Sequence, residues 1–357
     1  MQKNISVLAG DGIGPEITTA TVKVLKSVNQ HFNHALTPTV GLVGGDAYDR
    51  YGVHLPEETI ALAEKSDAIL FGAVGGPVNQ PDNPRFKNVE KNVILALRQR
   101  FDLFANLRPL KILPIAAAAS PLKKKIINGL DILIVRELVS GIYFGPRRQY
   151  EENGERVAED TNRYKAGEIE RILRVGFKAA AGRRRKATVV DKANVLETSR
   201  LWRSVTEAVK KDFSEVAVEY MYIDNAAMQL VRAPANFDVI ITENMFGDIL
   251  SDLGGAVVGS IGLLPSASLN GRNFGLYEPI HGSAPDIAGK NIANPTAQIF
   301  SLALMLRHTF GLEREAEAVE KAVSAAWAKG LKTKDLAAPG EPWLGTKEFG
   351  QAVADLI

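Results

Sequence analysis

Two aspartates four residues apart, Asp248 and Asp252, are the first candidates for chemistry in this sequence. A helix over residues 244–252 would place both carboxylates on one face, where they repel each other. A divalent cation would remove that repulsion, and oxygen ligands favour Mg²⁺ or Mn²⁺ over zinc. Asp224, which follows an apolar run at residues 216–222, could complete the set. The alternative is that each aspartate caps a helix or faces solvent.

Three arginines could bind a substrate that carries several carboxylates. Arg108 and Arg136 directly follow apolar runs, and Arg98 ends a predicted helix over residues 90–98. The planar guanidinium binds a carboxylate through two parallel hydrogen bonds, so converging arginines would indicate a di- or tricarboxylate. Since the sequence gives no distances, their convergence is a hypothesis.

The predicted helix over residues 90–98 places Glu90, Ile94 and Arg98 on one face, with Leu95 adjoining. A guanidinium beside an aliphatic patch suits a ligand with both a carboxylate and a branched alkyl group. Taken alone, the pattern is more typical of an amphipathic helix whose aliphatic residues face the core.

Lys192 and Tyr143 are candidates for proton transfer. Lys192 directly follows an apolar run, and burial beside a cation can lower the pKa of a lysine until it acts as a base. Tyr143 lies near the start of a polar segment and could donate a proton. A structural lysine and an interface tyrosine are the respective alternatives.

The elements that must position these residues form an α/β pattern with a largely parallel open sheet. Helices are predicted over residues 15–29 and 168–181, and the predicted strands cover residues 5–9, 67–71, 101–107, 132–135, 187–190, 216–222 and 238–242. Open α/β sheets bind ligands outside the carboxyl ends of their strands. Polar residues follow several of these ends: Arg108, Arg136, Lys192, Asp224 and Asn244.

The glycine-rich turn at residues 10–14 suggests a dinucleotide fingerprint but does not match one. The Rossmann pattern G-x-G-x-x-G requires glycine where Pro15 stands, and it needs an acidic residue at the end of the second strand, whereas Asp46 lies rather far along. We therefore do not predict a Rossmann fold.

A polar segment at residues 143–157 is predicted to form a projecting hairpin. It contains Asn153-Gly154, which is a strong signal for a two-residue hairpin turn. Because an isolated hairpin is marginally stable in water, we expect it to pair with the same arm of a second subunit. The basic run at residues 183–186 is predicted to be a solvated helix end rather than a nucleic-acid site.

Composition excludes several classes of protein. The 357 residues suggest about two domains. The chain has no cysteine, which excludes disulfides, thiolate zinc sites and a cysteine nucleophile. With 43 basic and 41 acidic residues, the net charge of +2 offers little attraction for nucleic acid or a membrane surface. No apolar run is long enough to span a membrane, and we expect a cytoplasmic protein.

The motifs, in their order, resemble those of the β-decarboxylating dehydrogenase family, the isocitrate/isopropylmalate dehydrogenases. The matching segments are residues 10–16 (GDGIGPE), 104–109 (FANLRP), 135–138 (VREL), 141–145 (GIYFG), 191–196 (DKANVL), 246–253 (FGDILSDL) and 278–295 (EPIHGSAPDIAGKNIANP). The resemblance implies an isopropylmalate/isocitrate dehydrogenase-like open sheet. It also implies a discontinuous cofactor-binding domain over residues 1–103 and 260–357, and a central domain over residues 104–259 with an arm at about 141–160.

The resemblance also implies a role for each candidate. Arg98, Arg108 and Arg136 would bind the malate carboxylates, and Asp224, Asp248 and Asp252 would bind Mg²⁺ or Mn²⁺. Lys192 would remove the hydroxyl proton, and Tyr143 would protonate the carbon after loss of CO₂. Lys192 and Asp224 would reach the site from a second subunit, so that a homodimer shares its active sites.

The cofactor implied by the resemblance is NAD. The nicotinamide side would include Gly76, Pro77 and Glu90, and the adenosine side would include His281, Gly282, Ser283, Ala284, Asp286 and Asn294. The carboxylate of Asp286 would accept bonds from the ribose hydroxyls and repel a 2′-phosphate. Relatives that use NADP carry a cationic or phenolic pair at Asp286 and Ile287, which this sequence lacks.

Within the family, Ile94 and Leu95 favour an isopropyl group over a third carboxylate. The expected reaction is oxidation and decarboxylation of (2R,3S)-3-isopropylmalate to 4-methyl-2-oxopentanoate in leucine biosynthesis. The alternatives are a D-malate, tartrate or isocitrate-type substrate and a family member that binds ligands or RNA without catalysis. A metal-dependent hydrolase is disfavoured, because the sequence offers no second metal cluster and no obvious water-activating histidine.

Overall fold

The computed structural model describes the backbone of residues 1–357 and every side chain except that of Ala118. The chain divides into two compact units. The first comprises residues 1–103, 114–119 and 259–357, and the second comprises residues 104–113 and 120–258. Each is described separately below.

The first unit contains strands β1 (Gln2–Gly10), β2 (Ala35–Val40), β3 (Ala68–Ala73), β11 (Pro265–Leu269) and β12 (Gly275–Pro279). Its α-helices are α1 (Gly14–Phe32), α2 (Gly45–Tyr51), α3 (Glu57–Glu64), α4 (Ala96–Arg100), α10 (Thr296–His308), α11 (Glu313–Ala328) and α12 (Thr346–Ala354). A π-helix, η1, covers Lys91–Leu95, and short 3₁₀ turns cover η2 (Ala116–Ala118), η5 (Ile261–Leu263) and η6 (Lys334–Leu336).

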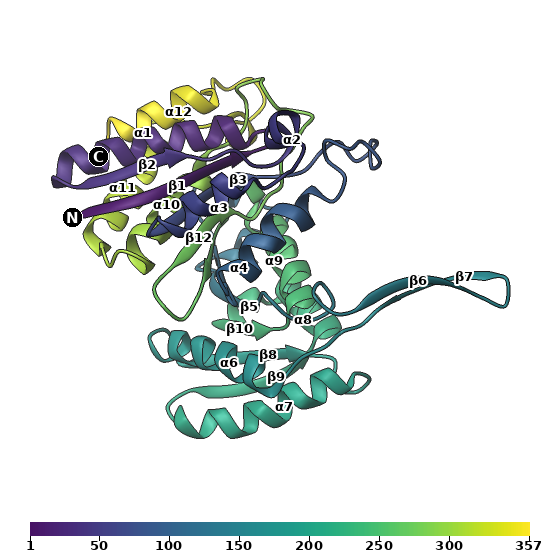
Figure 1. The fold of residues 1–357 in the computed structure, drawn as a ribbon. Helices are drawn as coiled ribbons and strands as arrows, with labels where there is room; N and C mark the ends of the chain where they lie inside the picture. Colours follow the sequence, from purple (N-terminus) through teal and green to yellow (C-terminus); the bar gives the residue numbers. More distant parts are fainter. The chain divides into compact units, whose positions relative to one another are not determined.

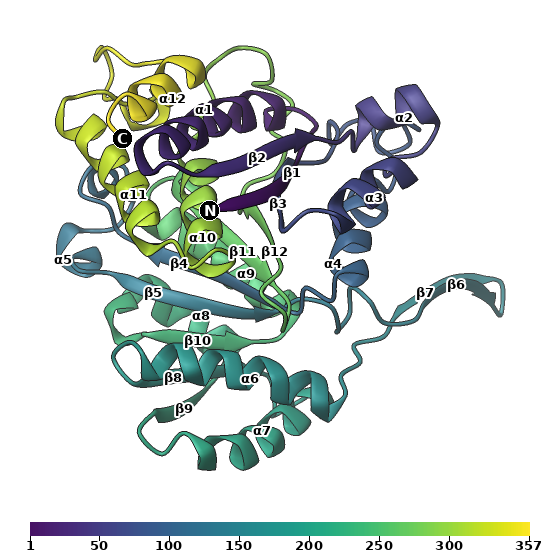
Figure 2. The same cartoon turned by 60° about the vertical axis from the view of Figure 1, so that its left-hand side comes forward.

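The strands of the first unit run in the order β2-β1-β3-β12-β11, and only the β11–β12 pair is antiparallel among the pairs described there. Helix α1 packs against α12 and α10, and α10 packs against β11 and β12 (Figures 1 and 2). β3 is buried along its whole length, as expected for a parallel strand covered on both faces.

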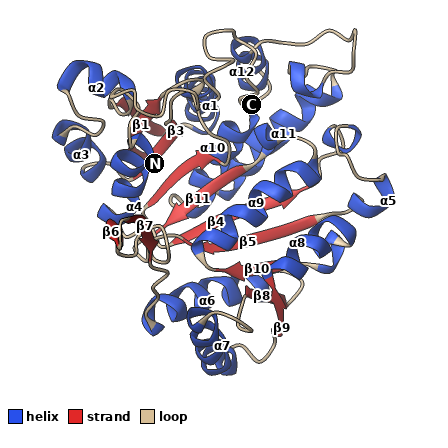
Figure 3. Ribbon diagram, turned by 90° about the vertical axis from the view of Figure 1, so that its right-hand side faces the viewer, coloured by secondary structure: helices blue, strands red, loops and turns tan.

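The second unit contains strands β4 (Ala105–Lys111), β5 (Asp131–Glu137), β6 (Arg147–Glu152), β7 (Glu155–Asp160), β8 (Lys186–Asp191), β9 (Ala217–Tyr222) and β10 (Val239–Thr242). Its helices are α5 (Lys124–Ile127), α6 (Ala166–Ala181), α7 (Glu197–Val209), α8 (Ile223–Arg232) and α9 (Asn244–Val258), with 3₁₀ turns η3 (Lys210–Asp212) and η4 (Pro234–Asn236). The sheet order is β4-β5-β10-β8-β9, and α6 and α9 pack against it (Figure 3).

The projecting hairpin is confirmed. β6 and β7 pair antiparallel, and Asn153 and Gly154, both with positive φ, form the turn between them. Two positive φ values match the twist of the flanking strands, which is why Asn-Gly is favoured there. The hairpin extends away from the helices of its own unit, as Figure 1 shows.

Two expectations about local structure are wrong. The strand predicted over residues 101–107 is β4, which begins at Ala105 and ends at Lys111. It includes Pro109, which lies opposite Leu133 of β5. The basic run after α6 is not simply solvated. Arg183 donates through Nε to the buried Asp238 at 2.9 Å and through Nη2 to Asp131 at 2.7 Å. A buried carboxylate requires such a partner, so the run stabilises the unit.

Candidate functional site

The register of β4 and β5 places two arginines on one face of the second unit's sheet. Asn106 lies opposite Arg136 in the antiparallel pair, and Arg108 follows Asn106 by two residues. Because side chains alternate along a strand, all three point to the same face. Helix α9 packs against both strands and brings its own polar side chains to this face.

Asp248 of α9 is the point at which these side chains meet. Its Oδ1 accepts from Arg108 Nη1 at 3.3 Å and from Arg136 Nη1, and its Oδ2 accepts from Tyr143 Oη at 3.1 Å. Asp252, one turn further along α9, lies 3.9 Å from Arg108 Nη1. Arg108 and Arg136 therefore do converge.

Arg108 and Arg136 are each held by a neutral asparagine side chain, a role that the sequence did not predict. Arg136 is only 1% exposed, and its Nε and Nη2 both donate to Asn244 Oδ1, at 3.0 and 2.8 Å. Gly247 leaves room for this side chain, since a Cβ there would lie 2.7 Å from Arg136 Cγ. Arg108 Nε donates to Asn106 Oδ1 at 2.6 Å. Asn106, two positions before Arg108 in a predicted strand, could have been found from the alternation of strand side chains.

The charge of Asp248 affects the protonation of two neighbouring side chains, Tyr143 and Asp252. Burial, and then the charge of Asp248, raise the pKa of Tyr143 above its usual value. Partial burial and the charge of Asp248 raise the pKa of Asp252, and the Arg108 guanidinium opposes the shift. A tyrosine that keeps its proton near neutrality is a suitable proton donor.

Glu137, which follows Arg136, should make the stability of the fold depend on pH. Burial raises its pKa to about 7, although its carboxylate accepts from the amides of Val139 and Ser140, each at 3.0 Å. Because the folded pKa lies above the unfolded one, this group favours folding below about pH 4.5, and that contribution is lost as the pH rises through 7.

We expect the stability of a Glu137→Gln variant, relative to that of the wild type, to increase as the pH rises. Between pH 5 and 8 the difference in unfolding free energy should move in favour of the variant by up to roughly 3 kcal/mol. Denaturant unfolding at a fixed protein concentration measures this difference, with the exposed Glu197→Gln as control. A difference for Glu137→Gln that stays constant with pH would contradict the prediction.

Lys192 and Asp224 form an ion pair with each other. Lys192 Nζ donates to Asp224 Oδ1, and the Asp224 side chain is 63% exposed. The hydrogen bond from Lys192 lowers the pKa of Asp224. Among the residues that the structure describes, no three His, Cys, Asp or Glu side chains lie together as a metal-binding group. Within one chain, Asp224 therefore does not join Asp248 and Asp252.

In the first unit, the two segments predicted to bind the cofactor lie against each other at Gly75. A Cβ at Gly75 would lie 3.1 Å from Glu90 Oε1 and 3.1 Å from Ser283 Oγ. The predicted nicotinamide-side residues Gly76 and Pro77 follow directly and are partly exposed.

The predicted adenosine-side residues differ in what they offer a ligand. Gly282 and Asp286 are exposed, and Ala284 has a positive φ of 40°. His281 Nε2 is buried and has no hydrogen-bond partner among the described residues. Asn294, by contrast, uses its side chain within the unit, where Oδ1 accepts from Thr296 N at 3.0 Å and Nδ2 donates to Asp335 at 3.0 Å.

The segment with Ile94, Leu95 and Arg98 is not a regular α-helix. Residues 91–95 form a π-helix, whose wider turn removes Glu90 from the face predicted by four-residue spacing. Glu90 is exposed, whereas Ile94 belongs to the core and Leu95 packs against it. Arg98 is buried and donates through Nη2 to Glu278 at 3.1 Å, while its Nε has no partner among the described residues.

The structure is an α/β protein in which two arginines of the second unit converge on Asp248, and two segments of the first unit approach each other at Gly75. Residues 4–353 match the family model described as isocitrate/isopropylmalate dehydrogenase. The chain therefore belongs to the isocitrate/isopropylmalate dehydrogenase family of oxidatively decarboxylating enzymes. The open α/β fold predicted from the sequence is confirmed.

Relatives and solved structures agree with this assignment. The chain is 56% identical to a 3-isopropylmalate dehydrogenase of Bacillus licheniformis, over 96% of this chain and 92% of that protein. It is 55% identical to a 3-isopropylmalate dehydrogenase of Geobacillus kaustophilus, over 99% and 95%. An isocitrate dehydrogenase structure from Methylococcus capsulatus superposes with a TM-score of 0.88 at 32% identity, covering 100% of this chain and 99% of that one. Among the described residues, none of the helices combines the length and apolar character needed to cross a membrane.

Proposed function

We propose that this enzyme oxidises and decarboxylates (2R,3S)-3-isopropylmalate with NAD, as a cytoplasmic step of leucine biosynthesis. The products are 4-methyl-2-oxopentanoate, CO₂ and NADH. The observation that carries the proposal is the contact of Arg108, Arg136 and Tyr143 with Asp248, because it joins carboxylate binding, a proton donor and a candidate metal ligand. The curated relatives described above carry the name of this activity.

The arginines bind the two carboxylates of the substrate. Arg108 and Arg136 of the second unit supply fixed guanidinium groups, and Arg98 of the first unit offers a buried Nε without a partner among the described residues. Charge-assisted, bidentate hydrogen bonds of this kind orient a carboxylate as well as binding it. The substrate would compete with Asp248 for the Nη1 donors of the two arginines of the second unit.

Two proton transfers complete the reaction. Lys192 removes the hydroxyl proton as the C2 hydride leaves. After the bond to the C3 carboxylate breaks and CO₂ departs, Tyr143 donates its Oη proton to C3. Tyr143 can supply this proton because its Oη is a hydroxyl donor that already donates to Asp248 Oδ2 at 3.1 Å.

The residues present fit a hard divalent cation. Asp248 and Asp252 offer carboxylate oxygens one helical turn apart, and the Asp252 side chain is 60% exposed. Asp224 of a second subunit would add the third carboxylate of a Mg²⁺ or Mn²⁺ site. The bound ion would polarise the substrate hydroxyl and stabilise negative charge on its oxygens during decarboxylation.

The first unit fits NAD. The buried His281 Nε2, which has no partner among the described residues, and the exposed Asp286 carboxylate provide polar groups in the same segment as Ser283. NAD would accept the hydride from C2. The nicotinamide side comprises Gly76, Pro77 and Glu90, and the adenosine side comprises His281, Gly282, Ser283, Ala284, Asp286 and Asn294.

An Asp286→Lys/Ile287→Tyr variant should lose its preference for NAD. The lysine replaces a repulsive charge with one that attracts a 2′-phosphate, so the ratio of kcat/KM for NADP to that for NAD should rise by at least about tenfold. Initial rates with each cofactor at saturating substrate measure the ratio, with Asp355→Lys as a remote charge control. An unchanged ratio would refute the assignment of Asp286.

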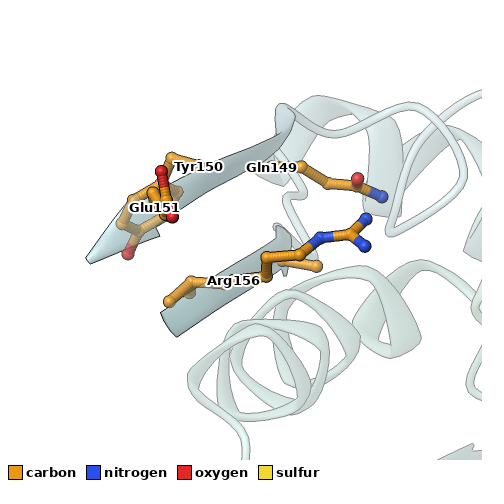
Figure 4. Close-up of a pocket in the computed structure, with 6 residues that line it drawn as sticks. Gln149, Tyr150, Glu151 and Arg156 are labelled. Atoms are coloured by element: carbon orange, nitrogen blue, oxygen red, sulfur yellow. The ribbon is translucent and has the colours of Figure 1, made fainter. Parts of the chain in front are cut away.

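A homodimer with shared sites is part of the proposal, and three features of the second unit support it. Asp224 does not join Asp248 and Asp252 in a metal-binding group of described residues, so one chain alone lacks the three-carboxylate site. Met228 of α8 and Ile249 of α9 are each 53% exposed. The arm has a hollow lined by its own residues, among them Gln149, Tyr150, Glu151 and Arg156 (Figure 4), which a second arm could fill.

Substrate choice tests the proposal most directly. We expect kcat/KM for 3-isopropylmalate, with NAD and Mg²⁺, to exceed that for isocitrate, D-malate and tartrate, because Ile94 and Leu95 are aliphatic. A preference for isocitrate, D-malate or tartrate would identify that compound as the substrate in place of 3-isopropylmalate. Absence of NADH formation with all four compounds would refute the proposed function.

A further inference from the structure

The turn at residues 10–16 does not have the dinucleotide fingerprint, yet it contacts both segments proposed to bind NAD. On the nicotinamide side, the Asp11 carboxylate is only 6% exposed. Its Oδ1 accepts from the amide of Gly45 at 2.7 Å, and its Oδ2 accepts from the amide of Gly75 at 3.1 Å. Asp11 therefore fixes the backbone one residue before Gly76.

On the adenosine side, Glu16 in the first turn of α1 has the corresponding role. Its two carboxylate oxygens accept from the backbone amides of Gly289 and Asn291, the second at 3.2 Å. Both amides lie within the segment 281–294. One carboxylate thus holds two backbone positions of that segment through charge-assisted hydrogen bonds.

Backbone contacts between the two carboxylates complete the arrangement. Ile13 N donates to Ser283 O at 2.8 Å. At Gly12, whose φ is +58°, an added Cβ would lie 1.9 Å from the same Ser283 oxygen, so only glycine permits this approach. The turn is therefore in direct contact with the adenosine-side segment between its two anchoring residues.

We propose that Asp11 and Glu16 are positioning residues for the dinucleotide, holding the two halves of its site in register through backbone amides. Asp11 sets the start of the nicotinamide segment and Glu16 sets the adenosine segment. The two segments approach each other at Gly75, where an added Cβ would lie 3.1 Å from both Glu90 Oε1 and Ser283 Oγ. This inference rests on the cofactor site proposed above.

The direct test is binding of NADH to the apoenzyme, without substrate or metal. We expect the dissociation constant, from NADH fluorescence, to rise about 10- to 100-fold for Glu16→Ala, because two hydrogen bonds to a charged acceptor are lost. Glu16→Gln keeps one acceptor oxygen and should give a smaller rise, as should Asp11→Asn. Glu348→Gln is the matched control, since Glu348 accepts from the side chain of Asn291 at 2.8 Å but not from its amide.

Two further readouts separate positioning from general loss of structure. Hydrogen exchange of peptides over residues 281–294 in the apoenzyme should be faster in Glu16→Gln, with exchange in α6 unchanged. The KM for NAD should rise while kcat at saturating NAD stays within about threefold of wild type.

The outcomes distinguish this inference from the function on which it rests. If the wild type binds NADH and the Glu16 variants bind it more weakly, positioning by Glu16 is supported. If Asp11→Asn also binds NADH more weakly, positioning by Asp11 is supported as well. Wild-type affinity in all of these variants overturns the inference and leaves the proposed function intact. A wild type that does not bind NADH overturns both.

Discussion

A Lys192→Met variant should lose about 10²- to 10⁴-fold in kcat, which is the usual contribution of a positioned general base. Methionine is also an unbranched side chain, one atom shorter than lysine, but it cannot accept a proton or donate to Asp224. Because Lys192 lies on the surface of its unit with 28% of its side chain exposed, the fold should be preserved. Lys210→Met, which removes a comparable pair with Glu207, should retain wild-type activity.

The same variant tests whether two chains share one site. Asp248→Asn should also be inactive, because it removes the negative charge that Arg108 and Arg136 contact and replaces one acceptor oxygen with an NH₂ donor. Mixing the two inactive variants under conditions of subunit exchange should restore about one quarter of wild-type activity, since half of the dimers are mixed and each has one intact site.

The mixing experiment has a clear negative result. If Lys192 served the site on its own chain, every site in a mixed dimer would lack one of the two groups, and no activity would return. Recovery must also scale with the fraction of mixed dimer, which can be measured with a tag on one variant.

Much of the fold was predictable because its signals are local. Asn153-Gly154 defines a hairpin turn in any context, and buried parallel strands such as β3 are continuous apolar runs. Strand β11 escaped prediction for the opposite reason. Its Ser266 and Ser268 are fully buried in the sheet, and no hydrophobic pattern distinguishes such residues from a loop.

The site was predictable in its residue types but only partly in its geometry. Strand alternation could have joined Asn106 to Arg108, whereas the π-turn before Arg98 inserts a residue that spacing rules do not detect. Whether Asp224 joins Asp248 and Asp252 in one metal-binding group depends on how α8 packs against α9, and in the structure these three carboxylates form no such group. The four-residue spacing of side chains on a helix does not indicate tertiary contacts of this kind.

An Arg136→Lys variant should lose about 10²- to 10⁴-fold in kcat/KM for the substrate, although the charge is conserved. The guanidinium donates to Asn244 from two nitrogens and to Asp248 from the third. A lysine ammonium is a point charge that cannot reproduce this planar fork, and two or more hydrogen bonds to a charged group are lost. The loss should fall mainly on KM if Arg136 binds the ground-state carboxylate, and on kcat if its grip strengthens in the transition state.

The matched variant for this test is Asn244→Ala, which leaves Arg136 in place but removes its acceptor. It should lower kcat/KM less than Arg136→Lys, because the guanidinium keeps its charge and loses only its orientation. Both variants lie in the second unit, so NADH binding to the apoenzyme, which we propose involves the first unit, should stay at wild-type affinity. Arg136→Lys activity within threefold of wild type would show that Arg136 only supports the sheet, and weaker NADH binding in either variant would show that the substitution disturbs more than the carboxylate site.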